Sequence, residues 1–520
     1  MAIFDSIKPN KVKRNKFSLS HERKFSMNMG DLVPIMCQEI VPGDNFRVNT
    51  ETLMRLAPML APIMHRVNVY THYFFVPNRL VWPEWEDFIT GGRLGTSAPV
   101  MPYFLQNTPA IVTSKGYFEP GTLWDYLGLP TCEEIGSTYP TIPEVSVLPF
   151  RAYQLIWDEY YRDQNLMPSL DMTYYSGAIS SESELLKLLT LRKRCWEKDY
   201  FTSALPFAQR GGEALVPFSA EVTYKDVSDV RFADGSSPSA VYDIMGDDQL
   251  MVGLDTPGRI ENIENIESGT TTINDLRRAI KIQEWLERAA RGGSRYIEAI
   301  LSHFGVRSSD SRLQRPEYLG GGKSPVVISE VLSTVGTLEE SEFSPQGTMS
   351  GHGISIGNKN GFQRSFEEHG YVIGIMSVLP RTAYQQGVPR SFWRKDKFDY
   401  YWPEFAHLGE QEVLKQELKY SWGSTGNDET FGYQSRYAEY KYQPSTVHGD
   451  MKNTLDFWHM ARKWDQSENC PPLNSEFVTA DPTHRIFAVE DETLHKLWVQ
   501  IYNEVDALRP MPFFGEPSLI

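Results

Sequence analysis

The sequence predicts a mainly β fold of the Greek-key sandwich type, with long excursions between its strands. Its 520 residues include 33 prolines, 38 glycines and 12% aromatic residues, a composition that favours loop-rich β structure over a helical bundle. Apolar runs that alternate at period two recur far apart along the chain, at irregular spacing. Strands separated in this way fit a Greek key better than a meander or a βαβ fold.

The clearest predicted strand covers residues 66–78, where every second residue from Val67 is β-branched or aromatic. Such alternation places one set of side chains on one face of a sheet: Val67, Val69, Thr71, Tyr73 and Phe75. Similar runs predict further strands at 370–380, 476–489 and 497–510.

Two helices are predicted from apolar residues at helical spacing. The first covers residues 151–165 and carries a stripe that we expect to pack in the core rather than to bind a cofactor: Tyr153, Ile156, Trp157, Tyr160 and Tyr161. The second covers residues 273–293, where Asn274 or Asp275 can cap the start and two glycines end the helix.

Between these helices, residues 218–272 form an acidic stretch with eleven acids against three basic residues. Turn signals such as ADGSSPS and DTPG separate short alternating runs. The stretch is predicted to be an exposed insertion with some hairpin character, and its simplest interpretation is a solvated surface loop.

The N-terminus has the opposite charge. The chain has a formal net charge of −16, yet its first 24 residues hold seven Lys or Arg against two acids. Five of these cations lie close enough to engage several phosphates of one DNA strand: Lys8, Lys11, Lys13, Arg14 and Lys16. If all five engage single-stranded DNA, the salt slope is about −3.5. With only Phe17 and Phe25 nearby for stacking, binding should be insensitive to base sequence.

Signatures of enzymes and cofactors are lacking in the sequence. The four cysteines are far apart without a CxxC pair, so neither a zinc site nor a disulfide scaffold is predicted. No run of 18 apolar residues and no signal-peptide pattern is present, so we expect a soluble protein made in a cytoplasm, without membrane insertion. The glycine-rich segment 317–327 contains G-K-S but lacks the first glycine of a phosphate loop, and it reads as a strand.

Seven segments nevertheless form a recognisable ordered series. From about residue 17 onwards the chain resembles the major capsid proteins of microviruses (Microviridae), most closely the gokushovirus branch. The segments that carry this resemblance are FSLSHERKFSMNMGDLVPI, HRVNVYTHYFFVPNRLVWPEWEDFITGG, LPFRAYQLIWDEYYRDQN, KDYFTSALPFAQRGG, QEWLERAARGGSRYIEAILSHFGVRSSDSRLQRPEYLGGGKSPVVISEV, GYVIGIMSVLPRTAYQQGVPRSFWRKDKFDYYWPEFAHLGEQEV and NEVDALRPMP.

The resemblance implies a single eight-stranded antiparallel jelly-roll with long inter-strand loops and a few helices. It divides the chain into a basic N-terminal arm (1–30) and one capsid domain (31–520), which contains the acidic insertion and a helical segment (273–305). Such subunits form pentamers and a 60-subunit T=1 shell around circular single-stranded DNA. No catalysis and no cofactor are implied. The protein is expected in the virion, assembled in the host bacterial cytoplasm.

The resemblance also suggests partners. A small basic internal protein would share the neutralisation of DNA, and a spike or pilot protein and a host cell-surface receptor are further candidates. The acidic insertion is a candidate host-attachment surface near the three-fold axes, with candidate residues Asp234, Asp247, Asp248 and Asp255. Alternatively, it is a protrusion that serves only shell stability, and the basic arm meets an acidic patch on a neighbouring subunit. The alternative functions are a β-rich carbohydrate-active enzyme and a receptor-binding module.

Overall fold

The computed structural model describes residues 13–105, 115–131, 143–212, 220–224, 263–268, 273–293, 295–332, 349–423, 426–465, 469–489, 491 and 493–514. The chain divides into two compact units, residues 1–208 with 292–520 and residues 209–291. Within the described residues, no helix is long and apolar enough to cross a membrane.

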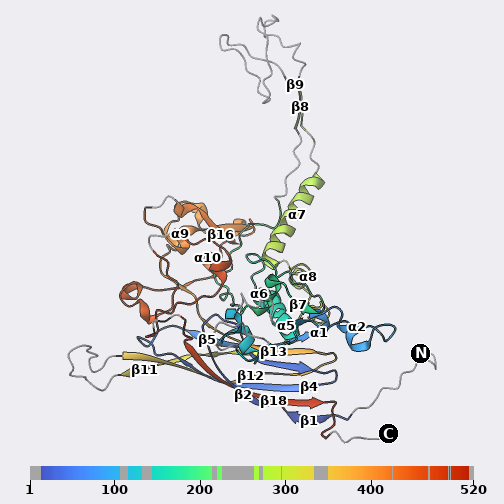
Figure 1. The fold of residues 1–520 in the computed structure, drawn as a ribbon. Coiled ribbons are helices and arrows are strands. Elements are labelled where there is room, and N and C mark those ends of the chain that lie inside the picture. Colours follow the sequence, from blue (N-terminus) through green and yellow to red (C-terminus); the bar gives the residue numbers. More distant parts are fainter. Residues whose placement is uncertain are drawn as a thin grey trace, which may run out of the picture. The chain divides into compact units, whose positions relative to one another are not determined.

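Two antiparallel sheets form the base of the larger unit (Figure 1). The six-stranded sheet has the order β1-β18-β4-β12-β11. β2 also pairs with β18, along the first half of that strand, whereas β1 pairs with its end. Its strands are β1 (Asn15–Ser18), β2 (His21–Met27), β4 (Asn45–Leu56), β11 (Val327–Leu332), β12 (Met349–Ser365) and β18 (Leu497–Arg509). The four-stranded sheet has the order β10-β5-β13-β3. Its strands are β3 (Val33–Ile40), β5 (Val67–Pro77), β10 (Glu317–Pro325) and β13 (Gly370–Pro380).

Helices and short elements occupy the connections between these strands. Those before residue 220 are α1 (Asn78–Val81), α2 (Trp85–Thr90), β6 (Tyr103–Phe104), η2 (Lys115–Phe118), α4 (Leu123–Tyr126), α5 (Leu148–Ile156), η3 (Trp157–Tyr161), β7 (Ala178–Ile179) and α6 (Glu182–Leu189). Those after residue 293 are α8 (Tyr296–Phe304), β14 (Ala383–Tyr384), η5 (Arg390–Phe392), η6 (Lys397–Asp399), η7 (Pro403–Phe405), β15 (Glu410–Leu414), α9 (Lys415–Leu418), η8 (Gly426–Asp428), β16 (Thr430–Ser435), α10 (Ala438–Lys441), β17 (Ser445–Thr446), η9 (Gly449–Lys452), η10 (Asp456–Trp458) and α11 (Ser475–Val478).

Three of the four predicted strands are confirmed, as β5, β13 and β18. The prediction of a strand at 476–489 is wrong. There the Asn474 side chain accepts a hydrogen bond from the Phe477 amide (2.8 Å) and caps the short helix α11, and Pro482 follows in an irregular segment. In a capped helical turn, backbone N–H and C=O groups form local hydrogen bonds, so they are not available for pairing with an adjacent strand.

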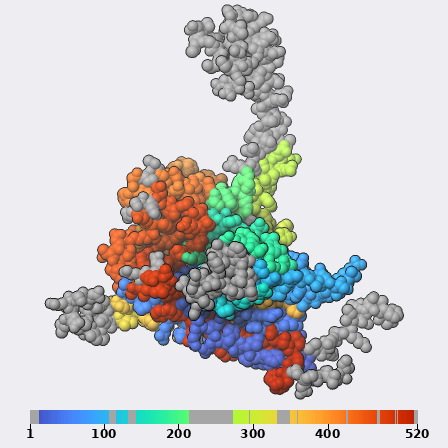
Figure 2. Space-filling view, in the orientation of Figure 1, coloured from blue at the N-terminus to red at the C-terminus, as the bar shows by residue number. Residues whose placement is uncertain are grey.

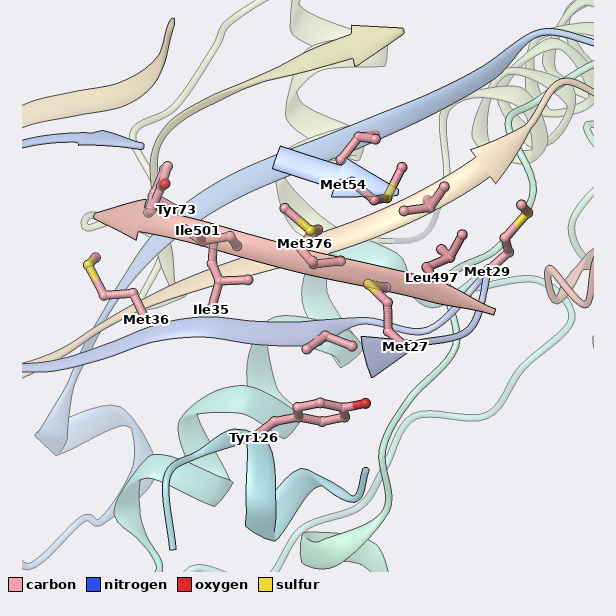
Figure 3. Packing of buried hydrophobic residues seen from close by; sticks show 14 of the residues in the cluster. Met27, Met29, Ile35, Met36, Met54, Tyr73, Tyr126, Met376, Leu497 and Ile501 are labelled. Atoms are coloured by element: carbon pink, nitrogen blue, oxygen red, sulfur yellow. The ribbon is translucent and has the colours of Figure 1, made fainter. Parts of the chain in front are cut away.

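The main core fills the space between the two sheets (Figure 3). It is rich in methionine, and among its fully or almost fully buried side chains are Met27, Met36, Met54, Met376, Leu497 and Ile501. Methionine is flexible enough to fill the uneven gap between two twisted sheets.

Strand β5 is buried on both faces, although its alternation predicts only one apolar face. Tyr73 and Phe75 point into the core between the sheets, whereas Phe74 and Val76 belong to a second apolar cluster with residues of α5 and α6. In Figure 1 these helices lie over the β13 side of the four-stranded sheet. A sheet covered on both sides buries both sets of side chains.

The predicted helix at 151–165 forms as α5, which begins three residues earlier at Leu148, followed by the π-helical turn η3. Pro149 lies in the first turn of α5, where its missing N–H is not needed. The expected core packing of the stripe is confirmed, since Tyr153, Ile156 and Trp157 are buried in the second cluster.

The segment 317–327 begins with strand β10, as predicted, and its glycines have a packing role. A Cβ atom at Gly321 would lie 2.2 Å from the carbonyl oxygen of Thr71 on β5. The glycine therefore allows close approach of two backbones and does not cradle a phosphate.

In the smaller unit, β8 (Ala220–Tyr224) pairs antiparallel with β9 (Ile263–Ser268), and the helix α7 covers Ile273–Gly292. The predicted helix at 273–293 is therefore confirmed. The β8–β9 pair agrees with the hairpin character predicted for 218–272, and residues 225–262 of this stretch lie outside the described residues.

A buried carboxyl before β3 predicts a pH-dependent stability. Burial raises the pKa of Asp31 to about 6, so the folded protein binds a proton more tightly than the unfolded chain. This stabilisation is present below about pH 4 and is lost as pH rises through 6. Asp31→Asn should therefore raise stability relative to wild type by about 2 kcal/mol more at pH 7.5 than at pH 4.5, because the carboxyl of the unfolded chain is already mostly ionised at pH 4.5.

Denaturant midpoints of unassembled protein at the two pH values would measure this difference. Glu22→Gln on β2 provides the control variant, because it removes a carboxyl group from an exposed position. Equal effects of Asp31→Asn at both pH values would contradict the prediction.

Candidate nucleic-acid interface

The N-terminal segment forms the edge of the six-stranded sheet. Strand β1 pairs with the end of β18, from Asn15 opposite Arg509 to Ser18 opposite Asp506. The chain then continues into β2, which pairs with the first half of the same strand. Residues 15–27 of the predicted 1–30 arm thus lie in the sheet. Alternating polar and apolar residues suit this position, because one face meets the core and the other meets solvent.

The five candidate cations have different environments. Lys8 and Lys11 lie outside the described residues. Lys13 and Arg14 are exposed just before β1, and neither has an ion-pair partner among the described residues. The Lys16 Nζ lies on β1, 2.8 Å from the Asp506 Oδ2. The structure therefore brings Lys13, Arg14 and Lys16 together at one end of the sheet.

Arg23 of β2 is a structural residue. Its guanidinium donates hydrogen bonds to the carbonyl oxygens of Pro34 (3.3 Å) and Tyr126 (2.6 Å), and burial lowers its pKa. Lys24 lies 3.4 Å from Glu22 on the same strand. The exposed basic character of the N-terminal segment is therefore concentrated before and within β1.

A buried ion pair holds this end of the sheet. The fully buried Asp44, in the turn between β3 and β4, accepts hydrogen bonds at Oδ2 from the Arg509 Nε (3.2 Å) and from the Val41 amide (2.9 Å). Arg509 also donates to the Glu39 carbonyl oxygen (2.6 Å). The ion pair links the turn to the end of β18, the part of the strand that pairs with β1. It also neutralises the charge of Arg509.

Two phenylalanines of the C-terminal tail lie at β1, the strand that follows Lys13 and Arg14. The Phe513 ring stacks on Phe17 of β1, with centroids 5.8 Å apart and planes at 11°, and Phe514 lies edge-on to Phe513 at 4.9 Å. The Asn15 side chain holds the tail by donating to the Met511 carbonyl oxygen (2.7 Å). Figure 2 shows the C-terminal strand in red against the N-terminal strands in dark blue.

Sequence reasoning missed these two rings because it counted only aromatic residues near the cations in the chain. Phe25, which it did count, is half-buried and packs edge-on against Tyr126 at 6.0 Å. The sequence does show two adjacent phenylalanines in a proline-containing tail after the last predicted strand. It does not show that β18 pairs with β1, which is the pairing that brings this tail to the N-terminal segment.

The arrangement offers cations for phosphates and exposed rings for bases, which is the combination that binds single-stranded nucleic acid. No group of three potential metal ligands occurs within the described part of the chain. The four acidic candidates of the insertion, Asp234, Asp247, Asp248 and Asp255, lie outside the described residues.

Comparison with known proteins decides the family. A family model described as "Capsid protein (F protein)" matches residues 5–519. The chain belongs to this capsid protein family. Relatives named "Capsid protein VP1" include that of Chlamydia phage 1, which is 35% identical over 99% of this chain and 97% of its own length.

The corresponding proteins of Bdellovibrio phage phiMH2K (35% identical, 97% of this chain and 95% of the relative) and Spiroplasma virus 4 (30%, 99% and 97%) are also similar. The predicted resemblance to microvirus capsid proteins is confirmed. The capsid protein is a structural component of a virion and not an enzyme, so the alternative of a carbohydrate-active enzyme is wrong.

Proposed function

We propose that sixty copies of this capsid protein, arranged as pentamers, form a T=1 shell around a circular single-stranded DNA genome. The observation that carries the proposal is the strand order. Eight strands alternate between the two sheets along the chain, except that the consecutive β5 and β10 lie in the same sheet. β2, β4, β12 and β18 are in one sheet, and β3, β5, β10 and β13 are in the other.

Within the sheets, the first of these strands pairs with the last, the second with the seventh, the third with the sixth and the fourth with the fifth. This nested antiparallel pairing supports an eight-stranded jelly-roll, the architecture of many viral capsid subunits. On this view β1 and β11 extend one of its sheets.

The long connections supply surface for contacts between subunits. The segment after β13 exposes many aromatic side chains, including Phe392, Phe398, Tyr400, Tyr401, Trp402, Trp422, Tyr440 and Tyr442. Aromatic residues are enriched at protein interfaces, and a subunit that acts alone rarely exposes so many. They support obligate association of the copies.

Expression of the full chain, followed by sedimentation and electron microscopy, tests the shell. We expect closed particles or pentamers, because the exposed aromatic surface needs a partner. A monodisperse monomer at micromolar concentration would contradict the proposal.

The basic end of the sheet is proposed to contact the genome, which a small basic internal protein would help to neutralise. Lys8, Lys11, Lys13 and Arg14 are the proposed phosphate contacts, with Lys16 beside them. The supporting observation is the exposure of Lys13 and Arg14 beside β1. The alternative partner is an acidic patch of a neighbouring subunit.

The acidic insertion is proposed to face the host near the three-fold axes. Its net negative charge and the β8–β9 hairpin at its base support an exposed protrusion. A host surface receptor and a spike or pilot protein are the proposed partners, and assembly is proposed to take place in the host bacterial cytoplasm. A protrusion that serves only the stability of the shell is the alternative.

A further inference from the structure

We propose that Phe513 and Phe514 form a stacking platform for bases of single-stranded DNA, beside cations that hold its phosphates. The inference rests on the proposed contact between the basic end of the sheet and the genome. It adds the stacking of bases on Phe513 and Phe514 to the ionic contacts of the N-terminal cations. The two rings lie about 500 positions after those cations in the chain.

The two rings are held in place and yet remain accessible. Phe513 is supported on Phe17, while 62% of its own surface is exposed. Phe514 is 77% exposed and lies at 76° to Phe513. Because the rings are nearly perpendicular, each offers a separate surface to a base. The Asn15 bond to the tail reduces the entropy that ordering the rings on a ligand would cost.

The charges beside the rings fit a polyanion. Two carboxylates at this end of β18 are paired, Asp506 with Lys16 and the buried Asp44 with Arg509. The Arg14 guanidinium lies beside the same turn as Asp44, 3.4 Å from where a Cβ of Gly43 would be. The Cγ of Pro510 lies 3.7 Å from the same Cβ position, so Arg14 lies near the start of the tail that holds the rings, and the exposed Lys13 precedes it in the chain.

A single DNA strand uses all of these features together. Stacking of a base on an aromatic side chain tolerates any base, since every base has a π-face, and cations that track the backbone add to it. Apolar burial against a neighbouring subunit would use the rings, and the subunit would need an acidic patch at the same place to use the cations as well. The observations therefore favour DNA, and the subunit contact becomes an outcome of the test.

The test compares Phe513→Leu/Phe514→Leu with wild type in the full chain. Leucine keeps an apolar side chain but removes the π-face. Binding of a fluorescent oligo-dT to unassembled protein is measured between 50 and 200 mM salt. We expect affinity to fall about 10- to 100-fold, as the loss of one or two stacked bases requires, with an unchanged salt slope.

Two variants serve as controls. Phe304→Leu removes an equally exposed ring (79%) from α8 and should leave binding unchanged. Lys13→Gln/Arg14→Gln should make the salt slope less negative by about 1.4. Ultraviolet crosslinking of intact particles with peptide mapping provides a readout that does not depend on a variant, and should place DNA on residues 509–514.

The outcomes are distinguishable. If the leucine variant binds like wild type while the glutamine variant loses salt slope, the stacking inference is overturned and the proposed genome contact stands. If neither variant changes binding and no crosslink forms, both are overturned. If the leucine variant keeps DNA affinity but no longer forms particles, the rings contact a neighbouring subunit and the inference is wrong.

Discussion

Asp44→Ala should lower the free energy of unfolding by about 3–5 kcal/mol, the usual cost of removing one partner of a buried ion pair. The substitution would leave the Arg509 guanidinium without its carboxylate, and the Val41 amide without its acceptor. Since Arg509 ends β18, the loss should also loosen β1 and the tail that follows.

A double-mutant cycle isolates the pair. Arg509→Met added to Asp44→Ala should recover much of the lost stability, because the uncompensated buried charge disappears. Asp44→Asn, which keeps an acceptor oxygen, should cost less than Asp44→Ala. Denaturant midpoints of unassembled protein, followed by tryptophan fluorescence, measure each step. A loss below about 1 kcal/mol for Asp44→Ala would mean that the site rearranges or admits water.

Replacing Lys8, Lys11, Lys13 and Arg14 together by glutamine should make the salt slope of single-stranded DNA binding less negative by about 2.8. The affinity near 0.15 M salt should fall about 10- to 100-fold, because each phosphate contact releases counterions on binding. Particles assembled from the variant should contain less DNA. Oligonucleotide titration at several salt concentrations, together with the absorbance ratio of purified particles, checks both expectations.

Lys16→Gln is the matched control. Its ammonium already pairs with Asp506, so its replacement should change the slope less than that of an unpaired cation. Substitution is a cleaner test than deletion of residues 1–16, which would also remove half of β1. An unchanged slope and unchanged DNA content in the fourfold variant would instead favour contact of these cations with a neighbouring subunit.

How far each feature could be predicted depends on whether its cause is local. The strands at 66–78, 370–380 and 497–510 and the helix at 273–293 follow from side-chain periodicity, which acts within one element. At 476–489 a local competitor, the Asn474 cap, outweighed a similar apolar pattern. For β5, periodicity identified the face toward the other sheet, but the helices that bury the second face come from later in the chain.

The sequence by itself determined the family, most of the strands, the charge contrast between the basic start and the acidic insertion, and the position of five candidate cations. Only the tertiary structure decided that residues 15–27 join a sheet, that Arg509 is neutralised by Asp44, and that Phe513 stacks on Phe17. The reason is physical. Composition and periodicity report on neighbours in the chain, whereas these contacts arise when the last strand pairs with the first, across nearly 500 residues.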